Sequence, residues 1–222
     1  AASAATQLVF TTQPSATGTA GTNLAAQPVV QIQDALGNLV AAATDAVTLT
    51  MYSNALCTVA AAGLSATTNP VTAVGGVATF AGVKSTLSGT LYLKAAAGGL
   101  TTACSTAIVV SPAAASKLVY TTQPSATGTA GTALAQQPVV QVRDTYDNVV
   151  NSTATVTLTP FTDSSCNVTT GTGTPSGNSL AAVAGTSTFT AFSYTKAETI
   201  YLRASSGILT TDCSTAVAVS PA

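Results

Sequence analysis

Residues 8–22 have the sequence LVFTTQPSATGTAGT, and residues 118–132 repeat it with one change as LVYTTQPSATGTAGT. A match of this length at a fixed spacing is the signature of a tandem repeat. The spacing of 110 residues is close to the commonest size of a single domain. The sequence therefore predicts two tandem domains of the same fold, residues 1–112 and residues 113–222.

The four cysteines fall one pair to each repeat, and the members of each pair are 47 positions apart: Cys57 and Cys104, then Cys166 and Cys213. Zinc sites usually place two cysteines within a few residues of each other and often recruit histidine, and this chain has no histidine. Free thiols are the alternative to a disulfide. We expect one disulfide within each repeat, and hence an oxidising, extracytoplasmic setting.

The composition excludes several classes of partner. The net charge is -1 and only 6% of the residues are charged, so no electrostatic footprint for nucleic acid or an anionic membrane exists. Threonine and serine together supply 63 of the 222 residues, which keeps the surface hydrated without charge. No apolar run approaches the roughly 18 residues that a membrane-spanning helix needs. We expect neither nucleic-acid binding nor membrane insertion.

Both ends of the sequence match the junction between the repeats. The chain opens with AASAATQ, as the second repeat opens with AAASK, and it ends in SPA, the counterpart of residues 111–113. This pattern favours two links cut from a longer array, in which the neighbouring repeats are the first expected partners.

The first repeat contains short β-type segments separated by Gly, Pro, Asn and Ser, with no helical period. Residues 29–34 alternate apolar Val30 and Ile32 with Gln31 and Gln33, which is typical of a half-buried strand. Seven strands are predicted in the first repeat, at residues 8–13, 29–34, 47–51, 57–61, 76–82, 91–97 and 103–110.

Three local expectations follow from the same patterns. The tract SATGTAGT after Pro14 is expected to be a loop, and Pro160 is expected to shorten its strand. Cys104 shares its parity with Ile108 and Val110 along residues 103–110, so its sulfur is expected at the edge of the core.

Seven short strands in about 110 residues predict an all-β fold: two tandem immunoglobulin-like sandwiches, each of two antiparallel sheets with about seven strands. An all-β barrel is the alternative. The tryptophan of immunoglobulins is missing, and the cysteines lie later than in the usual second and sixth strands. Each repeat is therefore expected to share the immunoglobulin architecture without being related to antibodies.

Several runs carry a resemblance to a known family: LVFTTQPSATGTAGT, QPVVQIQDALGN, VTLT, GVATF and LYLKAAAGGLTTACSTAIVVSP. Together they resemble the bacterial immunoglobulin-like tandem repeats of large cell-surface and adhesin-type proteins. The resemblance covers both repeats and implies an extracellular or cell-surface location, with roles as stalk, adhesive tip or filament subunit. The cysteine pair departs from the usual sequence pattern of these repeats and suggests an additional covalent cross-link.

The sequence contains few residues that could act in catalysis. Without histidine there is no imidazole base, and the single glutamate, Glu198, has no counterpart in the first repeat. No nucleophile elbow, phosphate-binding loop or dinucleotide fingerprint occurs. We expect no enzyme and no cofactor.

One turn is a candidate metal site. Asp144, Asp147 and Asn148 could supply oxygen ligands to Ca²⁺, as could Asp34 and Asn38 in the first repeat. The competing interpretation, which we favour, is a hairpin turn whose carboxylate bonds the backbone ahead of it.

Two functions remain open. The first is a structural unit of an extracellular stalk, fibre or filament, which could also contact other copies of the same chain. The second is an adhesive module that binds a glycan or a host protein through its end loops. Residues 169–179 differ from their counterpart at residues 60–70, and the outward-facing Tyr92 and Tyr201 could contact sugars.

Overall fold

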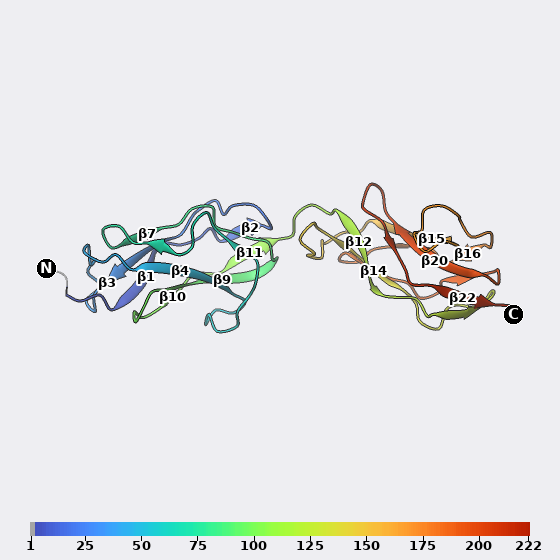
Figure 1. The fold of residues 1–222 in the computed structure, drawn as a ribbon, viewed down its shortest axis with the longest axis horizontal. Coiled ribbons are helices and arrows are strands. Elements are labelled where there is room, and N and C mark those ends of the chain that lie inside the picture. Colours follow the sequence, from blue (N-terminus) through green and yellow to red (C-terminus); the bar gives the residue numbers. More distant parts are fainter. Residues whose placement is uncertain (1–2) are drawn as a thin grey trace. The chain divides into compact units, whose positions relative to one another are not determined.

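The computed structural model describes residues 3–222 as two compact all-β units (Figure 1). The first unit ends at Ala113 and the second begins at Ala114, one residue beyond the boundary expected from the repeat. Residues 3–222 form no helix, and so none that is long and apolar enough to cross a membrane.

The first unit consists of eleven strands, several of them only two residues long. They are β1 (Gln7–Thr12), β2 (Thr17–Thr19), β3 (Val29–Gln33), β4 (Ala46–Tyr52), β5 (Leu64–Ser65), β6 (Val71–Thr72), β7 (Val77–Thr79), β8 (Lys84–Ser85), β9 (Gly89–Ala96), β10 (Ala103–Cys104) and β11 (Ile108–Ser111). One sheet has the order β1-β3-β7. The other has the order β2-β11-β9-β4-β6 with β10 beside β9, and β5 pairs with β8.

The second unit has the same arrangement. Its strands are β12 (Lys117–Thr122), β13 (Thr127–Thr129), β14 (Val139–Arg143), β15 (Thr155–Phe161), β16 (Pro175–Ser176), β17 (Ser179–Ala181), β18 (Thr186–Thr188), β19 (Ser193–Tyr194), β20 (Thr199–Ser205), β21 (Asp212–Cys213) and β22 (Val217–Ser220). The sheet orders are β12-β14-β18 and β13-β22-β20-β15-β17. The predicted all-β sandwich of about seven principal strands is confirmed in each repeat.

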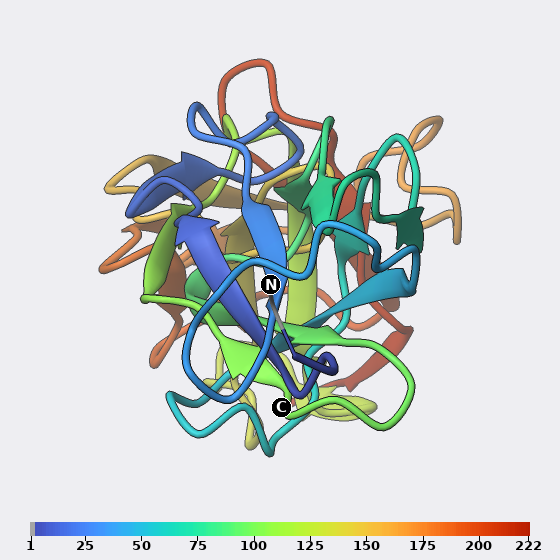
Figure 2. The same ribbon diagram turned by 90° about the vertical axis from the view of Figure 1, so that its left-hand side faces the viewer.

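Alternating burial explains why two sheets face each other. In β3, Val30 and Ile32 are completely buried while the glutamines between them are half-buried. In β9, Leu91 and Leu93 likewise point into the core. Each unit buries its own cluster of such residues between its sheets. Figure 2 shows β1 and β3, in dark and mid blue, side by side in one of the two layers of the first unit.

The SATGTAGT tract is not a loop throughout, which corrects the expectation from sequence. Thr17–Thr19 form β2, and this strand pairs in parallel with β11, the last strand of the repeat. The sheets are therefore not purely antiparallel. A Cβ at Gly18 would lie 3.0 Å from the Leu24 side chain, and the equivalent distance at Gly128 is 2.7 Å, so glycine avoids crowding against the leucine in both repeats.

Two of the predicted strands are different in the structure. Cys57 lies in a turn with a φ of 52°, so residues 57–61 do not form a strand. Residues 103–110 form two strands, because the Ser105 hydroxyl accepts the Leu93 N–H at 2.9 Å and replaces a backbone partner there. Inward-facing Ser105 and Ile108 are separated by two residues, which reverses the parity, so Cys104 faces outward and not toward the core.

Pro160 does not shorten its strand. β15 has seven residues, as β4 has. The edge strand β17 pairs only with Thr155, Val156 and Thr157, so β15 has no strand partner on that side at Pro160. An N–H is not required there, and the Pro160 carbonyl still accepts the Gly171 N–H at 3.0 Å.

A pair of glycine variants tests the packing of the second unit. Gly185 and Gly131 have φ values of 80° and 78°, but a Cβ at Gly185 would lie 2.0 Å from the Val150 carbonyl oxygen, and one at Gly131 would meet nothing within 4 Å. Gly131→Ala should cost about 1–2 kcal/mol for the left-handed conformation alone. Gly185→Ala should cost about 1–3 kcal/mol more, because the backbone must move.

Denaturant unfolding of the second unit measures both free energies. Equal losses for the two variants would contradict the close approach at Gly185.

Candidate functional site

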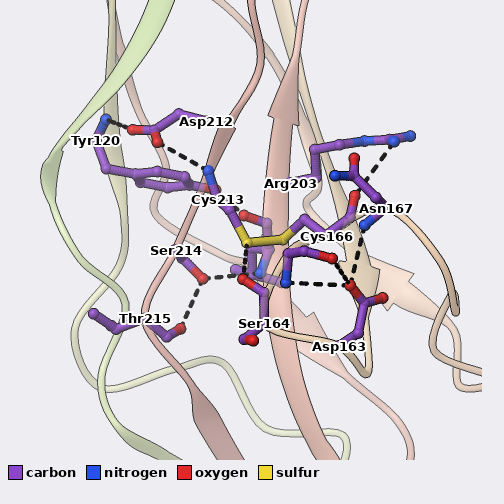
Figure 3. Close-up of a disulfide and its surroundings, with 12 residues drawn as sticks. Tyr120, Asp163, Ser164, Cys166, Asn167, Arg203, Asp212, Cys213, Ser214 and Thr215 are labelled. Carbon is purple, nitrogen blue, oxygen red and sulfur yellow. Dashed lines mark hydrogen bonds between the residues drawn. A yellow bond between two sulfur atoms is a disulfide. The ribbon is translucent and has the colours of Figure 1, made fainter.

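A disulfide joins Cys166 to Cys213 on the outer side of the larger sheet in the second repeat (Figure 3). Cys166 lies in the turn that follows β15, and Cys213 lies in β21, opposite Arg203 of β20. The first repeat contains the equivalent bond between Cys57 and Cys104, with the same separation of 47 residues. Among residues 3–222 there is no free cysteine.

Asp163 organises the turn that presents Cys166. Its Oδ1 accepts the N–H groups of Ser165 and Asn167, and its Oδ2 accepts those of Val168 and Thr169. The hydrogen bond from the Ser165 hydroxyl, followed by those from the backbone, holds the pKa of Asp163 well below its usual range. The carboxylate thus replaces regular secondary structure in holding this turn.

A cation lies over an aromatic ring beside each disulfide. The Arg203 guanidinium carbon is 4.5 Å from the centroid of the Phe161 ring, and Lys94 Nζ is 5.4 Å from that of Tyr52. Arg203 also donates to the Cys166 carbonyl at 3.5 Å. These cations are therefore packed against the disulfide turn and do not form an open binding site.

The two tyrosines predicted to face outward are half-buried. Tyr92 lies opposite Tyr52 in the sheet register, and Tyr201 lies opposite Phe161. Each therefore belongs to an aromatic pair next to the disulfide turn, and aromatic cross-strand pairs stabilise a sheet.

The calcium candidate is a side-chain-capped turn. Asp144 is completely buried, and its carboxylate accepts the N–H groups of Tyr146 and Asn148 at 2.8 and 2.9 Å and the Asn148 amide at 2.8 Å. The Asp147 carboxylate instead bonds Lys117 at 2.8 Å, which, with Arg143 nearby, lowers its pKa. Across the described residues, no three or more His, Cys, Asp or Glu side chains gather as a metal site would require.

The first repeat builds the same turn from Asp34. Its carboxylate accepts the Leu36 and Asn38 N–H groups at 3.0 and 2.9 Å, the Asn38 amide at 3.1 Å and the Ser3 N–H at 3.0 Å. The Asn38 side-chain bond, then the backbone bonds, hold the pKa of Asp34 well below its usual range. Buried and charged, Asp34 supports the turn in its ionised form.

The divergent loop of residues 169–179 is held by a polar cluster that sequence reasoning missed. The Tyr194 hydroxyl donates to Glu198 and accepts the Gly173 N–H at 2.6 Å, while Glu198 pairs with Lys196 at 3.0 Å and accepts the Thr172 N–H. Burial and the Glu198 bond raise the pKa of Tyr194 to about 12. The alternating run Tyr194, Lys196, Glu198, which the first repeat lacks, was the available signal.

Each unit has a surface hollow. That of the first repeat measures about 390 Å³ and lies between β6 and β7, with threonines, Pro70, Val71 and Ala81 around it. That of the second measures about 350 Å³ and lies along β13, with Thr, Gly, Ala and Ser around it. Neither hollow is lined by a charged or aromatic group, so neither offers an acid, a base or a stacking platform.

The ionised Asp34 leads to a pH prediction. Its contribution to stability should be fully present above the ordinary aspartate pKa of about 3.9 and be lost as the pH falls below that value toward the folded-state pKa. Asp34→Asn should lower the unfolding free energy of the first unit at neutral pH, and the deficit should shrink in acid. Urea unfolding across a pH series measures this difference.

Asp45→Asn is the matched control, since Asp45 is an exposed carboxyl of the same unit. A deficit for Asp34→Asn that stays constant from neutral to acidic pH would argue against an ionised cap.

Comparisons with known proteins identify similar folds only. No protein-family model matches the chain, and no curated protein sequence matches it.

The chain is similar to the Yersinia pseudotuberculosis adhesin InvE, with 18% identity and a TM-score of 0.36 over 96% of this chain and 58% of that one. The D0-D1 domain of intimin matches with 17% identity and a TM-score of 0.35, over 96% and 97% of the two chains. Domains 5-6 of the S-layer protein SbsC match with 16% identity and a TM-score of 0.29, over 96% and 98%. The chain thus spans little more than half of the InvE structure, and TM-scores this low carry no argument about function.

Proposed function

We propose that this chain is a load-bearing repeat unit of an extracellular stalk, fibre or filament, with spacing and assembly as its role. The observation that carries the proposal is the parallel pairing of β2 with β11, and of β13 with β22, in which the first part of each repeat is bonded to its last strand. No catalytic or cofactor chemistry is needed for this role.

The parallel pair of β2 and β11 resists extension because a pull on the two ends of the repeat slides the two strands past each other. In the first repeat, the Val109 N–H donates to the Ala16 carbonyl at 2.8 Å and the Ala20 N–H donates to the Ser111 carbonyl at 2.9 Å. Such bonds are loaded together in shear rather than one after another. The second repeat preserves both bonds, from Ala218 to Ala126 and from Ala130 to Ser220.

The disulfide adds a second barrier to extension. In the first repeat it encloses residues 57–104, which contain the strands from β5 to β10. This segment cannot lengthen even after β2 has separated from β11. Because disulfides persist in oxidising compartments, the same bonds support an extracellular or cell-surface location.

The second candidate function is adhesion to a glycan or a host protein. The observation that favours it is the loop of residues 169–179, which differs from its counterpart and is held by Tyr194 and Glu198. A glycan-array hit that disappears when this loop is replaced by residues 60–70 would favour adhesion over a purely structural role.

Single-molecule stretching tests the load-bearing function. Pulling from the two ends of the chain should require a clearly higher unfolding force than pulling through attachments at Thr22 and Ser111. These two exposed residues lie at the same end of the β2–β11 pair, so force applied between them opens the pair one bond at a time. Equal forces in the two geometries would contradict the proposal.

Reduction provides an independent readout in the same experiment. The 47-residue loop should hide about 16 nm of extended chain in each repeat at about 3.4 Å per residue. Adding a reductant should therefore lengthen each unfolding step by about this amount, and a variant with all four cysteines changed to serine should show the long step without reductant.

A further inference from the structure

The two copies of the repeat differ unevenly on their surfaces. Residues 11–22 and 121–132 are identical over twelve consecutive positions, although most of these side chains are exposed or half-buried. By contrast, residues 60–68 read AAAGLSATT where residues 169–177 read TTGTGTPSG. The two copies thus differ in this loop and are identical along β2 and β13.

Part of this identity has a structural cause. Gly18 must be small because of Leu24, and the Ser15 hydroxyl donates to the Thr17 carbonyl at 3.0 Å, as Ser125 does to Thr127 at 2.9 Å. The Thr19 carbonyl accepts the Thr22 N–H at 3.0 Å. These bonds use carbonyls of the edge strand β2, which discourages the addition of a foreign strand.

Other identical residues have no such cause. The side chains of Thr17, Thr19 and Thr22 are exposed, and so are those of Thr127 and Thr129. The last strand continues the pattern, because Ser111 pairs with Thr19 in register and is matched by Ser220 beside Thr129. Exposed hydroxyl side chains therefore occupy the same places along β2 and β11 in the first repeat and along β13 and β22 in the second.

This side is hollowed in the second repeat. The hollow of about 350 Å³ in the second repeat is lined by Thr127, Gly128, Thr129, Thr132, Ser220 and two alanines. Six of its seven lining positions carry the same residue in the first repeat, the exception being Asn23 in place of Ala133. The side chains that line this hollow are therefore repeated in the first copy at every position except Asn23.

The chemistry of this side favours a second copy of the same chain as its partner. A surface that meets an identical surface must not carry like charges, and none of the lining residues is charged. One weak contact per repeat also adds up along an array, because every contact after the first forms within an already joined pair.

We propose that the side of each sandwich formed by β2 and β11, and by β13 and β22, is a lateral self-association surface that joins neighbouring chains through packed threonine and serine side chains. Contact occurs through side chains and not by strand addition, since the edge carbonyls are already bonded. This inference rests on the proposed role in a fibre or filament and specifies which side of each repeat its neighbour contacts.

Sedimentation velocity of the 222-residue chain over a concentration series tests the surface. The wild-type chain should associate reversibly, with an association constant that hardly changes between low and high salt. Thr17→Glu combined with Thr127→Glu should lower that constant by at least about tenfold, because each contact then brings like charges together. Circular dichroism verifies that the variant remains folded, as expected for exposed positions.

Thr72→Glu combined with Ala181→Glu is the matched control. These exposed residues occupy equivalent places in β6 and β17, at the opposite edge of the same sheets, and the added charge is identical. The control variant should associate as the wild type does. Three results would each overturn the proposed surface. The wild-type chain could stay monomeric at every concentration, the association constant could fall equally in both variants, or association could disappear in high salt.

The outcome is separable from that of the stretching experiment, which is measured within one molecule. A chain that resists shear but never associates would overturn only the lateral surface. A chain that associates through this side but unfolds at equal force in both pulling geometries would overturn only the load-bearing role.

Discussion

The parallel pairing of the second strand of each repeat with its last strand is the constraint on which the rest of the structure depends. It joins Thr17–Thr19 to residues about 90 positions later, and so closes the larger sheet at one edge. Where the chain runs along this strand, a Cβ at Gly18 or Gly128 would lie within 3.0 Å of a leucine side chain, so a larger residue there would crowd the core. The two halves of the core, one on each sheet, are thereby held facing each other.

Aspartate carboxylates, two of them buried and one half-buried, hold three turns of the chain by hydrogen bonds. Asp34 and Asp144 cap equivalent turns from inside the protein, and Asp163 holds the turn that carries Cys166. Each of these groups is satisfied by several N–H donors, which is the condition under which a charged group can be buried without a large loss of stability. These three aspartates therefore have a structural role in their turns.

The outer face of the larger sheet combines rigidity with a neutral surface. On its middle strands, the disulfide turn covers a cation and an aromatic ring in both repeats, with Lys94 replaced by Arg203 and Tyr52 by Phe161. Along its β2 and β13 edge, the strands themselves expose threonine side chains and no charged group. The proposed role, in which each unit bears load and packs beside a neighbouring chain, requires both of these features.

The sequence by itself determined the two domains, the sandwich class and the buried faces of the long strands, because strand alternation is local and the repeat supplied an internal check. It also identified the cysteine pairs and the aspartate turn. It could not determine which way Cys104 points, since a single buried hydroxyl at Ser105 shifts the parity of that strand. Nor could it find the parallel strand within SATGTAGT or the cluster around Tyr194, because their partners are distant in sequence and no local pattern encodes them. Those features were decided by the tertiary structure, in which the packing of one sheet against the other selects among conformations that the local sequence leaves equally open.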